Sequence, residues 1–237
     1  MTMARETKIA IVSGGAGGIG RAVVSRLSGA GYSLVVLDNN EAAGKVVLGQ
    51  LDKNGTVGEF LAVDLTHKSE VQAAFDSVQH HKRRIDLLVN LAGGTLHAHP
   101  VQDFPLNEWM RVIDVNLKAT FLCCQAVLPL MKAQQGGVIV NTSSNFGVTG
   151  SPTRTAYSAA KAAIIAFTRS LALETRSYGI RVNAIAPGLT ATERVMKLYT
   201  REHWAMQADS IPMKRVAEPA DIAASVSRSW LATKANS

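Results

Sequence analysis

Cysteine is scarce in this sequence, which contains only two among its 237 residues. The two, Cys123 and Cys124, are adjacent, and neighbouring Cα atoms about 3.8 Å apart are closer than the roughly 4.4–6.8 Å usual across a disulfide. Two thiols alone do not make a zinc site either. We therefore expect neither a disulfide framework nor a bound metal ion.

Long apolar runs are also missing. No uninterrupted apolar stretch approaches the roughly 20 residues that a membrane helix needs. The N-terminus passes from Arg5, Glu6 and Lys8 into an apolar run that is too short for the core of a signal peptide. We expect a cytoplasmic protein without a membrane partner.

Charge of either sign is modest, because Asp, Glu, Lys and Arg make up 18% of the residues while 47% are apolar and 5% aromatic. This is the composition of a globular protein. Lys and Arg outnumber Asp and Glu by 25 to 18, but apart from Lys82-Arg83-Arg84 the basic residues are scattered. A solvated basic surface that favours anionic ligands explains this better than a nucleic-acid partner does.

Short β-branched runs alternate with longer helical patterns along the whole chain. Nearly continuous apolar runs are typical of parallel strands covered on both faces. The alternation predicts an α/β fold, a single Rossmann-type doubly wound parallel sheet flanked by helices, in one domain over residues 1–237. The expected strands are 9–12, 33–37, 57–63, 85–90, 138–142 and 180–186, and the expected helices are 19–30, 41–53, 68–80, 106–133, 155–178, 191–208 and 219–231.

A glycine-rich turn separates the first expected strand from the first expected helix. Residues 13–20 read SGGAGGIG, and Arg21 and Ala22 replace the Lys and Ser/Thr that a Walker phosphate loop requires. Glycines let the backbone approach a pyrophosphate, and the helix N-terminus offers unpaired N–H groups. Asp38 ends the second strand about twenty residues later, where a carboxylate can bind both ribose hydroxyls and repel a 2′-phosphate, which favours NAD.

Tyr157 and Lys161 lie four residues apart, which places them on one face of a helix. A nearby ammonium stabilises a phenolate and is expected to lower the pKa of the tyrosine from its usual value near 10. Ser144 follows the fifth expected strand, so it is expected to meet Tyr157 at the carboxyl edge of the sheet.

In this combination the chain resembles the short-chain dehydrogenase/reductase family over nearly its whole length. The motifs occur in the family's order: Ser13-Gly14-x-x-x-Gly18-Ile19-Gly20, Asp64-Leu65, Asn90-x-Ala92-Gly93, Asn116, Ser144, Tyr157-x-x-x-Lys161, Asn183 and Pro187-Gly188. The departures are Ser13 for the usual Thr, Leu91 for the second Asn of Asn-Asn-Ala-Gly, and an end at Ser237 without the family's last strand. We therefore expect the strand 181–186 to form a sheet edge that is covered by a partner subunit or by residues 219–237; otherwise we expect residues 190–237 to be poorly ordered.

The resemblance implies roles for individual residues. Tyr157 would exchange a proton with the substrate, Lys161 would lower the pKa of Tyr157 and bond the nicotinamide ribose, and Ser144 would orient the substrate oxygen. Asn116 would hold a water in the proton relay to Lys161. The implied cofactor-binding residues are Ser13, Gly14, Gly18, Ile19, Gly20, Asp38, Asp64, Leu65, Asn90, Ala92, Gly93, Tyr157, Lys161, Pro187, Gly188 and Thr192.

Together these features predict an NAD(H)-dependent oxidoreductase of a secondary alcohol or the matching ketone, acting as a homo-oligomer, either a dimer or a tetramer. Other interpretations are an NADP-dependent reductase of 3-oxoacyl thioesters and a nucleotide-binding protein with impaired catalysis. A methyltransferase using S-adenosylmethionine shares the glycine turn and Asp38 but gives no reason for Ser144, Tyr157 and Lys161 to converge. His97 and His99 follow the fourth expected strand. One interpretation is that they bind an acidic substrate, and the other is that they are exposed loop residues.

Overall fold

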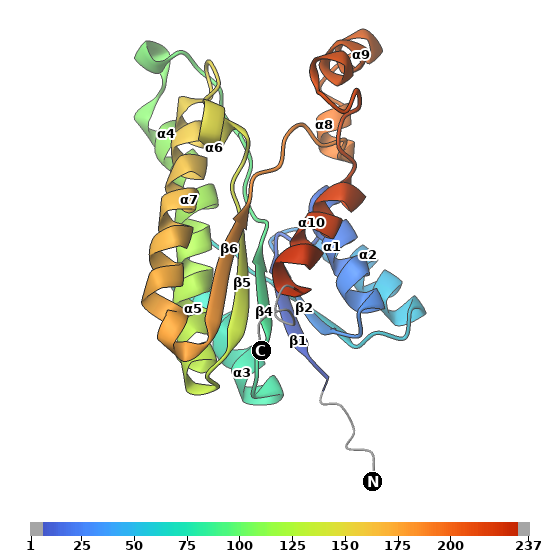
Figure 1. Cartoon of the computed structure of the whole chain (residues 1–237), viewed down its shortest axis with the longest axis vertical. Coiled ribbons are helices and arrows are strands. Elements are labelled where there is room, and N and C mark those ends of the chain that lie inside the picture. Colours follow the sequence, from blue (N-terminus) through green and yellow to red (C-terminus); the bar gives the residue numbers. More distant parts are fainter. Residues whose placement is uncertain (1–6, 232–237) are drawn as a thin grey trace.

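The computed structural model describes residues 7–231 and contains a parallel sheet with helices on both faces (Figure 1). Within the described residues the sheet has six strands in the order β3-β2-β1-β4-β5-β6. The strands are β1 (Ile9–Ser13), β2 (Ser33–Asp38), β3 (Gly58–Ala62), β4 (Leu87–Asn90), β5 (Gly137–Thr142) and β6 (Ile180–Ile185). The predicted doubly wound α/β fold is confirmed.

The helices form two layers, and α8 and α9 stand beyond the carboxyl ends of the strands (Figure 1). One layer contains α1 (Gly18–Gly29), α2 (Glu41–Lys53) and α10 (Pro219–Leu231), and the other contains α3 (Lys68–Lys82), α5 (Ala119–Ala133) and α7 (Thr155–Thr175). The shorter helices are α4 (Leu106–Ile113), α6 (Phe146–Thr149), α8 (Glu193–Met196) and α9 (Arg201–Ser210), with 3₁₀ turns at Val101–Asp103 and Arg176–Tyr178.

The core is divided between the two faces of the sheet because alternate residues of a strand point to opposite faces. In β1, Ile11 packs with α3 and α5, whereas Ala10 and Val12 pack with α1, α2 and α10. Every residue of β1 is buried. β3 and β6 differ from the expectation of two covered faces, since β3 has no fully buried residue and β6 exposes Asn183 and Ala184. Both are the outer strands of the sheet.

The helical stretch Leu106–Ala133 is long and apolar enough, by length and composition alone, to cross a membrane. An 18-residue window within its 28 residues has a mean hydropathy of 1.3. In this fold the apolar residues are part of the core. The helix α5 follows β4 and precedes β5 in the chain, and its buried residues pack on the sheet and against α3. Core packing therefore accounts for the hydrophobicity of this stretch.

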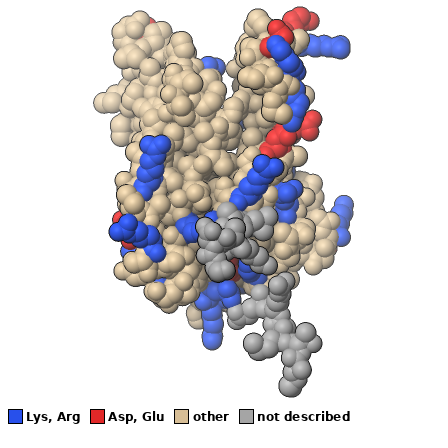
Figure 2. Space-filling model, viewed as in Figure 1, with Lys and Arg blue, Asp and Glu red and all other residues tan. Residues whose placement is uncertain are grey.

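Basic side chains on the face shown in Figure 2 are spread out rather than collected in one place. On the face shown in Figure 2, Lys and Arg lie over several separate elements. This distribution agrees with the solvated basic surface expected from the sequence.

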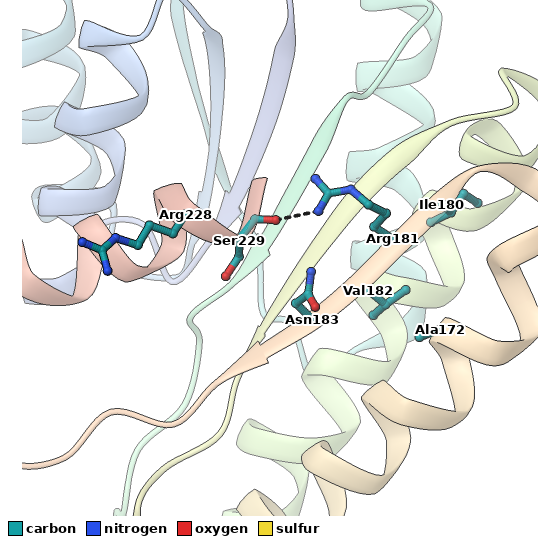
Figure 3. Close-up of a pocket in the computed structure, with 7 residues that line it drawn as sticks. All are labelled: Ala172, Ile180, Arg181, Val182, Asn183, Arg228 and Ser229. Atoms are coloured by element: carbon teal, nitrogen blue, oxygen red, sulfur yellow. Dashed lines mark hydrogen bonds between the residues drawn. The ribbon is translucent and has the colours of Figure 1, made fainter. Parts of the chain in front are cut away.

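The edge strand β6 borders a cavity of about 560 Å³ next to α10 (Figure 3). Arg181 of β6 crosses the cavity and donates a hydrogen bond from Nη1 to the carbonyl oxygen of Ser229, at 2.9 Å. Segment 219–231 thus contacts the predicted edge, and residues 190–231 form regular helices and loops. Residues 232–237, on which the expectation also rested, lie outside the described part of the chain.

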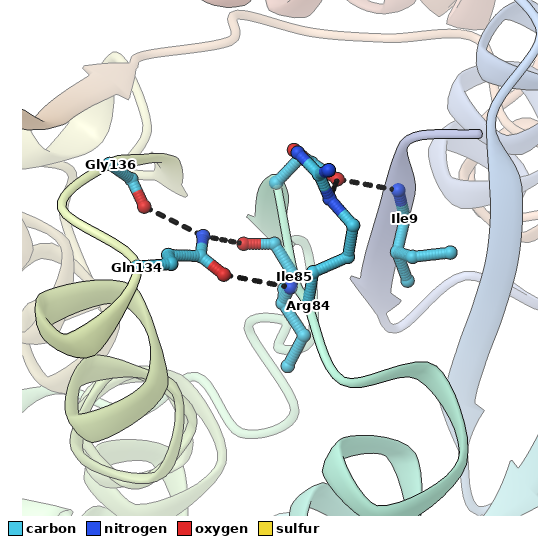
Figure 4. A network of polar contacts seen from close by, with 6 residues as sticks. Ile9, Arg84, Ile85, Gln134 and Gly136 are labelled. Atoms are coloured by element: carbon cyan, nitrogen blue, oxygen red, sulfur yellow. Dashed lines mark hydrogen bonds and ion pairs between the residues drawn. The ribbon is translucent and has the colours of Figure 1, made fainter. Parts of the chain in front are cut away.

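The amino ends of the central strands are joined by side chains (Figure 4). Gln134, after α5, accepts a hydrogen bond from the N–H of Ile85 at 3.3 Å and donates to the carbonyl oxygens of Ile85 and Gly136 at 2.6 and 2.7 Å. Asp86 accepts from the N–H of Ile9 at 2.8 Å and from Arg84. These bonds hold β1, β4 and β5 together at the edge opposite the predicted ligand site.

Candidate active site

The glycine turn packs so tightly that its backbone forms a cradle at the start of α1. Gly14 has a φ of +68°, and a Cβ there would lie 2.6 Å from the backbone nitrogen of Ala92. Gly17 is the N-cap of α1; no side chain caps this end, and the first turn contains no acidic residue. The first N–H groups of α1 and the positive end of its dipole are thus available to an anion.

Asp38 lies at the end of β2 and ties that strand to the glycine turn. Its Oδ2 accepts a hydrogen bond from the N–H of Ala16 and its Oδ1 accepts one from the N–H of Asn40, both at 3.1 Å. Each carboxylate oxygen can accept more than one hydrogen bond. The residue is therefore held firmly in place while it keeps acceptor capacity for hydroxyl groups.

A cleft of about 810 Å³ opens between these elements. Asp64 lines it and accepts hydrogen bonds from the N–H and hydroxyl of Thr66, at 2.9 and 2.7 Å. Burial acts to raise the pKa of Asp64, but these bonds and the nearby His67 outweigh it and lower the pKa below its ordinary value. The expected cofactor-binding residues found in the cleft are Gly14, Gly18, Ile19, Gly20, Asp38, Asp64, Leu65, Ala92, Gly93 and Thr192.

Ser13 and Asn90 are not among the residues that line this cleft, and their expected cofactor contacts stay a prediction. Both are buried, and the Ser13 hydroxyl donates to Oδ1 of Asn90 at 3.1 Å. Asn90 donates to Asn141 Oδ1 at 2.9 Å, and Asn141 donates to the hydroxyl of Thr168 at 3.0 Å. Ser13, Asn90 and Asn141 are register partners on β1, β4 and β5, so their side chains meet each other inside the sheet.

Tyr157 and Lys161 lie on α7, and Ser144 follows β5 at the same end of the sheet. Lys161 is only 3% exposed, and its Nζ donates to the carbonyl oxygen of Thr142 at 2.7 Å. The same Nζ lies 5.6 Å from the centre of the Tyr157 ring. The Ser144 hydroxyl donates to Oδ1 of Asn145 at 3.1 Å and is near enough to the phenol to lower the pKa of Tyr157, so the structure brings all three residues together.

The pKa directions of this group differ from the expectation. Burial raises the pKa of Tyr157, while Ser144, Arg194 and Arg154 act to lower it. Burial also lowers the pKa of Lys161 from 10.5 to about 7. Desolvation thus disfavours the charged form of both groups, and the net direction for Tyr157 is opposite to the expected one. The role of Lys161 in lowering this pKa stays a prediction.

Asn116 occupies a five-residue π-helical turn, Asp114–Lys118, between α4 and α5. Its Oδ1 accepts from the N–H of Gly94 at 3.1 Å, and its Nδ2 donates to the carbonyl oxygens of Gly94 and Val112 at 2.9 and 2.8 Å. The side chain thus clamps the loop after β4. Its expected role in a water relay to Lys161 stays a prediction.

The segment after β6 also reaches the cleft. Pro187 accepts a hydrogen bond from the N–H of Asn145 at 3.0 Å, and neither Pro187 nor Gly188 is among the cleft-lining residues. Thr192 does line the cleft and caps α8, and a Cβ on Gly18 would lie 2.8 Å from the Thr192 Cβ. The two walls of the cleft therefore approach each other at Gly18 and Thr192.

Arg194 was not singled out from the sequence, because its segment has little periodic pattern. It lines the cleft, and its guanidinium lies close to Gly94. Arg21 pairs with Glu193 at 3.5 Å, which joins α1 to α8 across the cleft. The signal that could have found these residues is the pair of opposite charges at Glu193 and Arg194 beside the expected cofactor residue Thr192.

The model of the family described as "short chain dehydrogenase" matches residues 8–203, most of the chain. The chain belongs to the short-chain dehydrogenase family. The family consists of oxidoreductases that use nicotinamide cofactors, and the cleft of this short-chain dehydrogenase has the glycine cradle and acidic strand end that such a cofactor needs.

Three known proteins illustrate the range of its relatives. The chain is 37% identical over 187 residues to the 3beta-hydroxysteroid dehydrogenase of Mediterraneibacter gnavus, which covers 79% of this chain and 67% of that protein. An NAD⁺-bound xylitol dehydrogenase is 31% identical, with a TM-score of 0.87 over 96% of this chain and 94% of that one. An actinorhodin polyketide ketoreductase with NADPH is 26% identical, with a TM-score of 0.91 over 96% and 91%.

Proposed function

We propose that this short-chain dehydrogenase transfers a hydride between NAD(H) and a secondary alcohol or the matching ketone. The observation that carries the proposal is the grouping of Ser144, Tyr157 and Lys161 at the carboxyl edge of the sheet. This group lies next to a cleft that is lined by the glycine turn and Asp38. Relatives that act on a hydroxysteroid and on xylitol, and a ketoreductase, support an alcohol or ketone as the substrate class. We expect a cytoplasmic, single-domain enzyme that works as a homo-oligomer.

The cofactor would lie along the cleft, with its pyrophosphate at the N-terminus of α1. When bound, the nicotinamide supplies or accepts the hydride. The uncapped N–H groups of α1 would bind the phosphate oxygens, and Asp38 would accept hydrogen bonds from the adenosine ribose. A 2′-phosphate at that position would meet the Asp38 carboxylate, which is the basis for proposing NAD over NADP.

Tyr157 would exchange a proton with the substrate oxygen. Burial raises the pKa of its phenol, so the residue holds its proton at neutral pH and can donate it to a forming alkoxide. In the oxidative direction the phenolate must form first, and Arg194 and Arg154 stabilise its negative charge. Ser144, which interacts with the phenol, would orient the same substrate oxygen.

Lys161 would position the nicotinamide ribose. Its ammonium has three N–H groups, and the carbonyl oxygen of Thr142 takes one of them. The others remain for ribose hydroxyls and for the phenol of Tyr157. A bound ribose would also replace part of the solvation that burial removes from the ammonium, and would favour its charged form.

The proposal is tested by following NADH absorbance with a panel of secondary alcohols and ketones, using the wild type and Tyr157→Phe. We expect turnover to fall by about 10²–10⁴-fold in the variant, since the change removes one hydroxyl and little packing. Tyr178→Phe, in the 3₁₀ turn that follows α7, is the matched control and should retain turnover. NADH titration of both variants should show unchanged affinity.

Turnover of Tyr157→Phe within a factor of a few of the wild type would overturn the assignment of Tyr157. Binding of NADH without turnover of any substrate in the panel by the wild type would favour the impaired nucleotide-binding protein instead. Tighter binding of NADPH than of NADH, with turnover of 3-oxoacyl thioesters, would favour the NADP-dependent reductase.

A further inference from the structure

Two histidines and a glutamate converge at the carboxyl end of the sheet, outside the catalytic group. His97 and His99 lie on the loop between β4 and α4, and Glu108 lies in the first turn of α4. The His97 Nδ1 is 3.0 Å and the His99 Nε2 is 2.7 Å from the same carboxylate oxygen, Oε2 of Glu108. All three ligand atoms lie within 4.8 Å of one another.

The surrounding structure holds these side chains in place. The His99 ring packs edge-to-face on Phe104, with ring centres 5.0 Å apart, and Phe104 packs in the same way on Trp109. The N–H of His99 donates to the carbonyl oxygen of Thr153 at 2.8 Å. The three side chains are about one-third exposed, so solvent ions can reach them, yet their positions are largely set before any ion arrives.

The backbone on either side of the cluster is strained. Leu96, just before His97, has a φ of +52°, and Thr153, which binds the backbone of His99, has a φ of +60°. Left-handed backbone at residues with a branched or bulky side chain is uncommon and costs roughly 1–3 kcal/mol at each position.

We propose that His97, His99 and Glu108 bind a divalent transition-metal ion, with Zn²⁺ as the best match. Two imidazoles and one carboxylate are a ligand set that zinc accepts, with a fourth position open to water or another ligand. Ligands about 2.0–2.2 Å from a tetrahedral zinc are separated by roughly 3.3 Å, so the His97–Glu108 contact of 3.0 Å and the His99–Glu108 contact of 2.7 Å would each lengthen by roughly half an ångström or less. This site departs from the expectation of no metal ion, which considered only the cysteines.

Other groups of the chain are poorer candidates. His67 lies 3.2 Å from Asp64 and 3.7 Å from Glu70, but this group has only one histidine, and Asp64 belongs to the cofactor cleft. His80 and His81 are adjacent at the C-terminal end of α3 and have no acidic partner in the contacts of the described residues. Cys123 and Cys124 are buried in α5.

A bound ion would join the loop 95–104 to α4. The backbone of His99 also donates a hydrogen bond to Thr153, which lies four residues before Tyr157. A bound ion would therefore also restrain the segment that leads into α7, at the carboxyl end of the sheet. The site does not supply a group to the proposed hydride transfer. Its existence is therefore independent of that proposal, and it can be tested without an activity assay.

The test is equilibrium binding of Zn²⁺ to the metal-stripped full chain, followed by calorimetry and by thermal unfolding. We expect one ion per chain in the wild type, a rise in melting temperature on adding Zn²⁺, and visible absorption typical of four-coordinate Co²⁺ when that ion is used instead. Glu108→Gln should weaken Zn²⁺ binding by more than the roughly 10–100-fold typical of an outer-shell change. His99→Gln is the second variant and should have the same effect.

The matched control is the double variant His80→Gln and His81→Gln, which removes two other histidines and should leave binding and the melting-temperature rise unchanged. Hydrogen exchange should slow in residues 95–104 on adding Zn²⁺ to the wild type and to this control, but not to Glu108→Gln. The proposal is overturned if the wild type binds no ion, or if Glu108→Gln and His99→Gln bind Zn²⁺ as tightly as the wild type does. Loss of binding in the His80/His81 control alone would place the ion on α3 and would equally reject it.

Discussion

Burying Lys161 has a cost in stability that depends on pH. In the folded chain burial lowers the pKa of this ammonium from 10.5 to about 7. Between these two values the unfolded chain keeps a proton that the folded chain loses, so the free energy of unfolding must rise with pH. The cost is largest below pH 7 and disappears above pH 10.5. Replacing Lys161 by Met removes the charge and keeps an unbranched side chain.

The magnitude follows from the two pKa values. One pKa unit corresponds to about 1.4 kcal/mol, so the drop from 10.5 to about 7 amounts to roughly 4 kcal/mol of lost stability at pH 7 and about 2 kcal/mol at pH 9. Lys161→Met also leaves the Thr142 carbonyl without its 2.7 Å hydrogen bond, at a cost of about 1–3 kcal/mol. We expect the cofactor-free variant to be more stable than the wild type by roughly 1–3 kcal/mol at pH 7, with the advantage shrinking by about 2 kcal/mol at pH 9.

Urea unfolding of the cofactor-free proteins at pH 7, 8 and 9 measures this difference. Burial raises the pKa of Cys123 to about 12, but this titration and all others are common to both proteins and cancel when their stabilities are subtracted. Lys53→Met, which changes an exposed lysine at the end of α2, should run parallel to the wild type. Parallel curves for Lys161→Met and the wild type would refute the argument that burial lowers the pKa of Lys161.

The other predictions concern the cofactor and the direction of the reaction. The Asp38 carboxylate would repel a 2′-phosphate, so Asp38→Ser should tighten NADPH binding and lower the ratio of the NADPH to the NADH dissociation constant. A fluorescence titration measures both constants, and equal affinities of the wild type for the two cofactors would contradict the prediction. Because burial raises the pKa of Tyr157, initial rates of alcohol oxidation should increase toward alkaline pH while ketone reduction, which needs the protonated phenol, stays active at neutral pH. Parallel pH profiles in the two directions would refute that assignment.

The sequence predicted the fold well because its strongest signals are local. Each expected strand lies within two residues of an observed one, and the expected helix 219–231 matches α10. The expected helix 191–208 is two helices, α8 and α9, because Thr200 caps a new helix by accepting a hydrogen bond from the N–H of His203 at 3.3 Å. The exposure of β3 and β6 depends on strand order, which the alternation alone does not specify.

The site was predictable in position but not in the state of its groups. Motif order placed Asp38 and Ser144 at the carboxyl ends of strands and Tyr157 on the helix that follows, and the structure has them there. The direction of the Tyr157 pKa could not follow from its spacing to Lys161, because it depends on how much water burial removes from both residues. The metal-site proposal rests on a contact between a loop and a helix that begins seven residues after His99, together with a backbone conformation that sequence patterns do not encode.

The buried amides show why a motif residue need not touch the ligand that the motif binds. Ser13 and Asn90 carry family motifs, yet their hydrogen bonds go to each other and to Asn141, across three strands in register. Buried polar groups are costly unless paired, so this chain of bonds favours one alignment of the strand ends. The glycine turn leaves β1 directly after Ser13, and Ala92 follows Asn90 into the cleft wall. A polar network inside the sheet thus holds in register the strand ends from which the glycine turn and the Ala92 wall of the cleft continue.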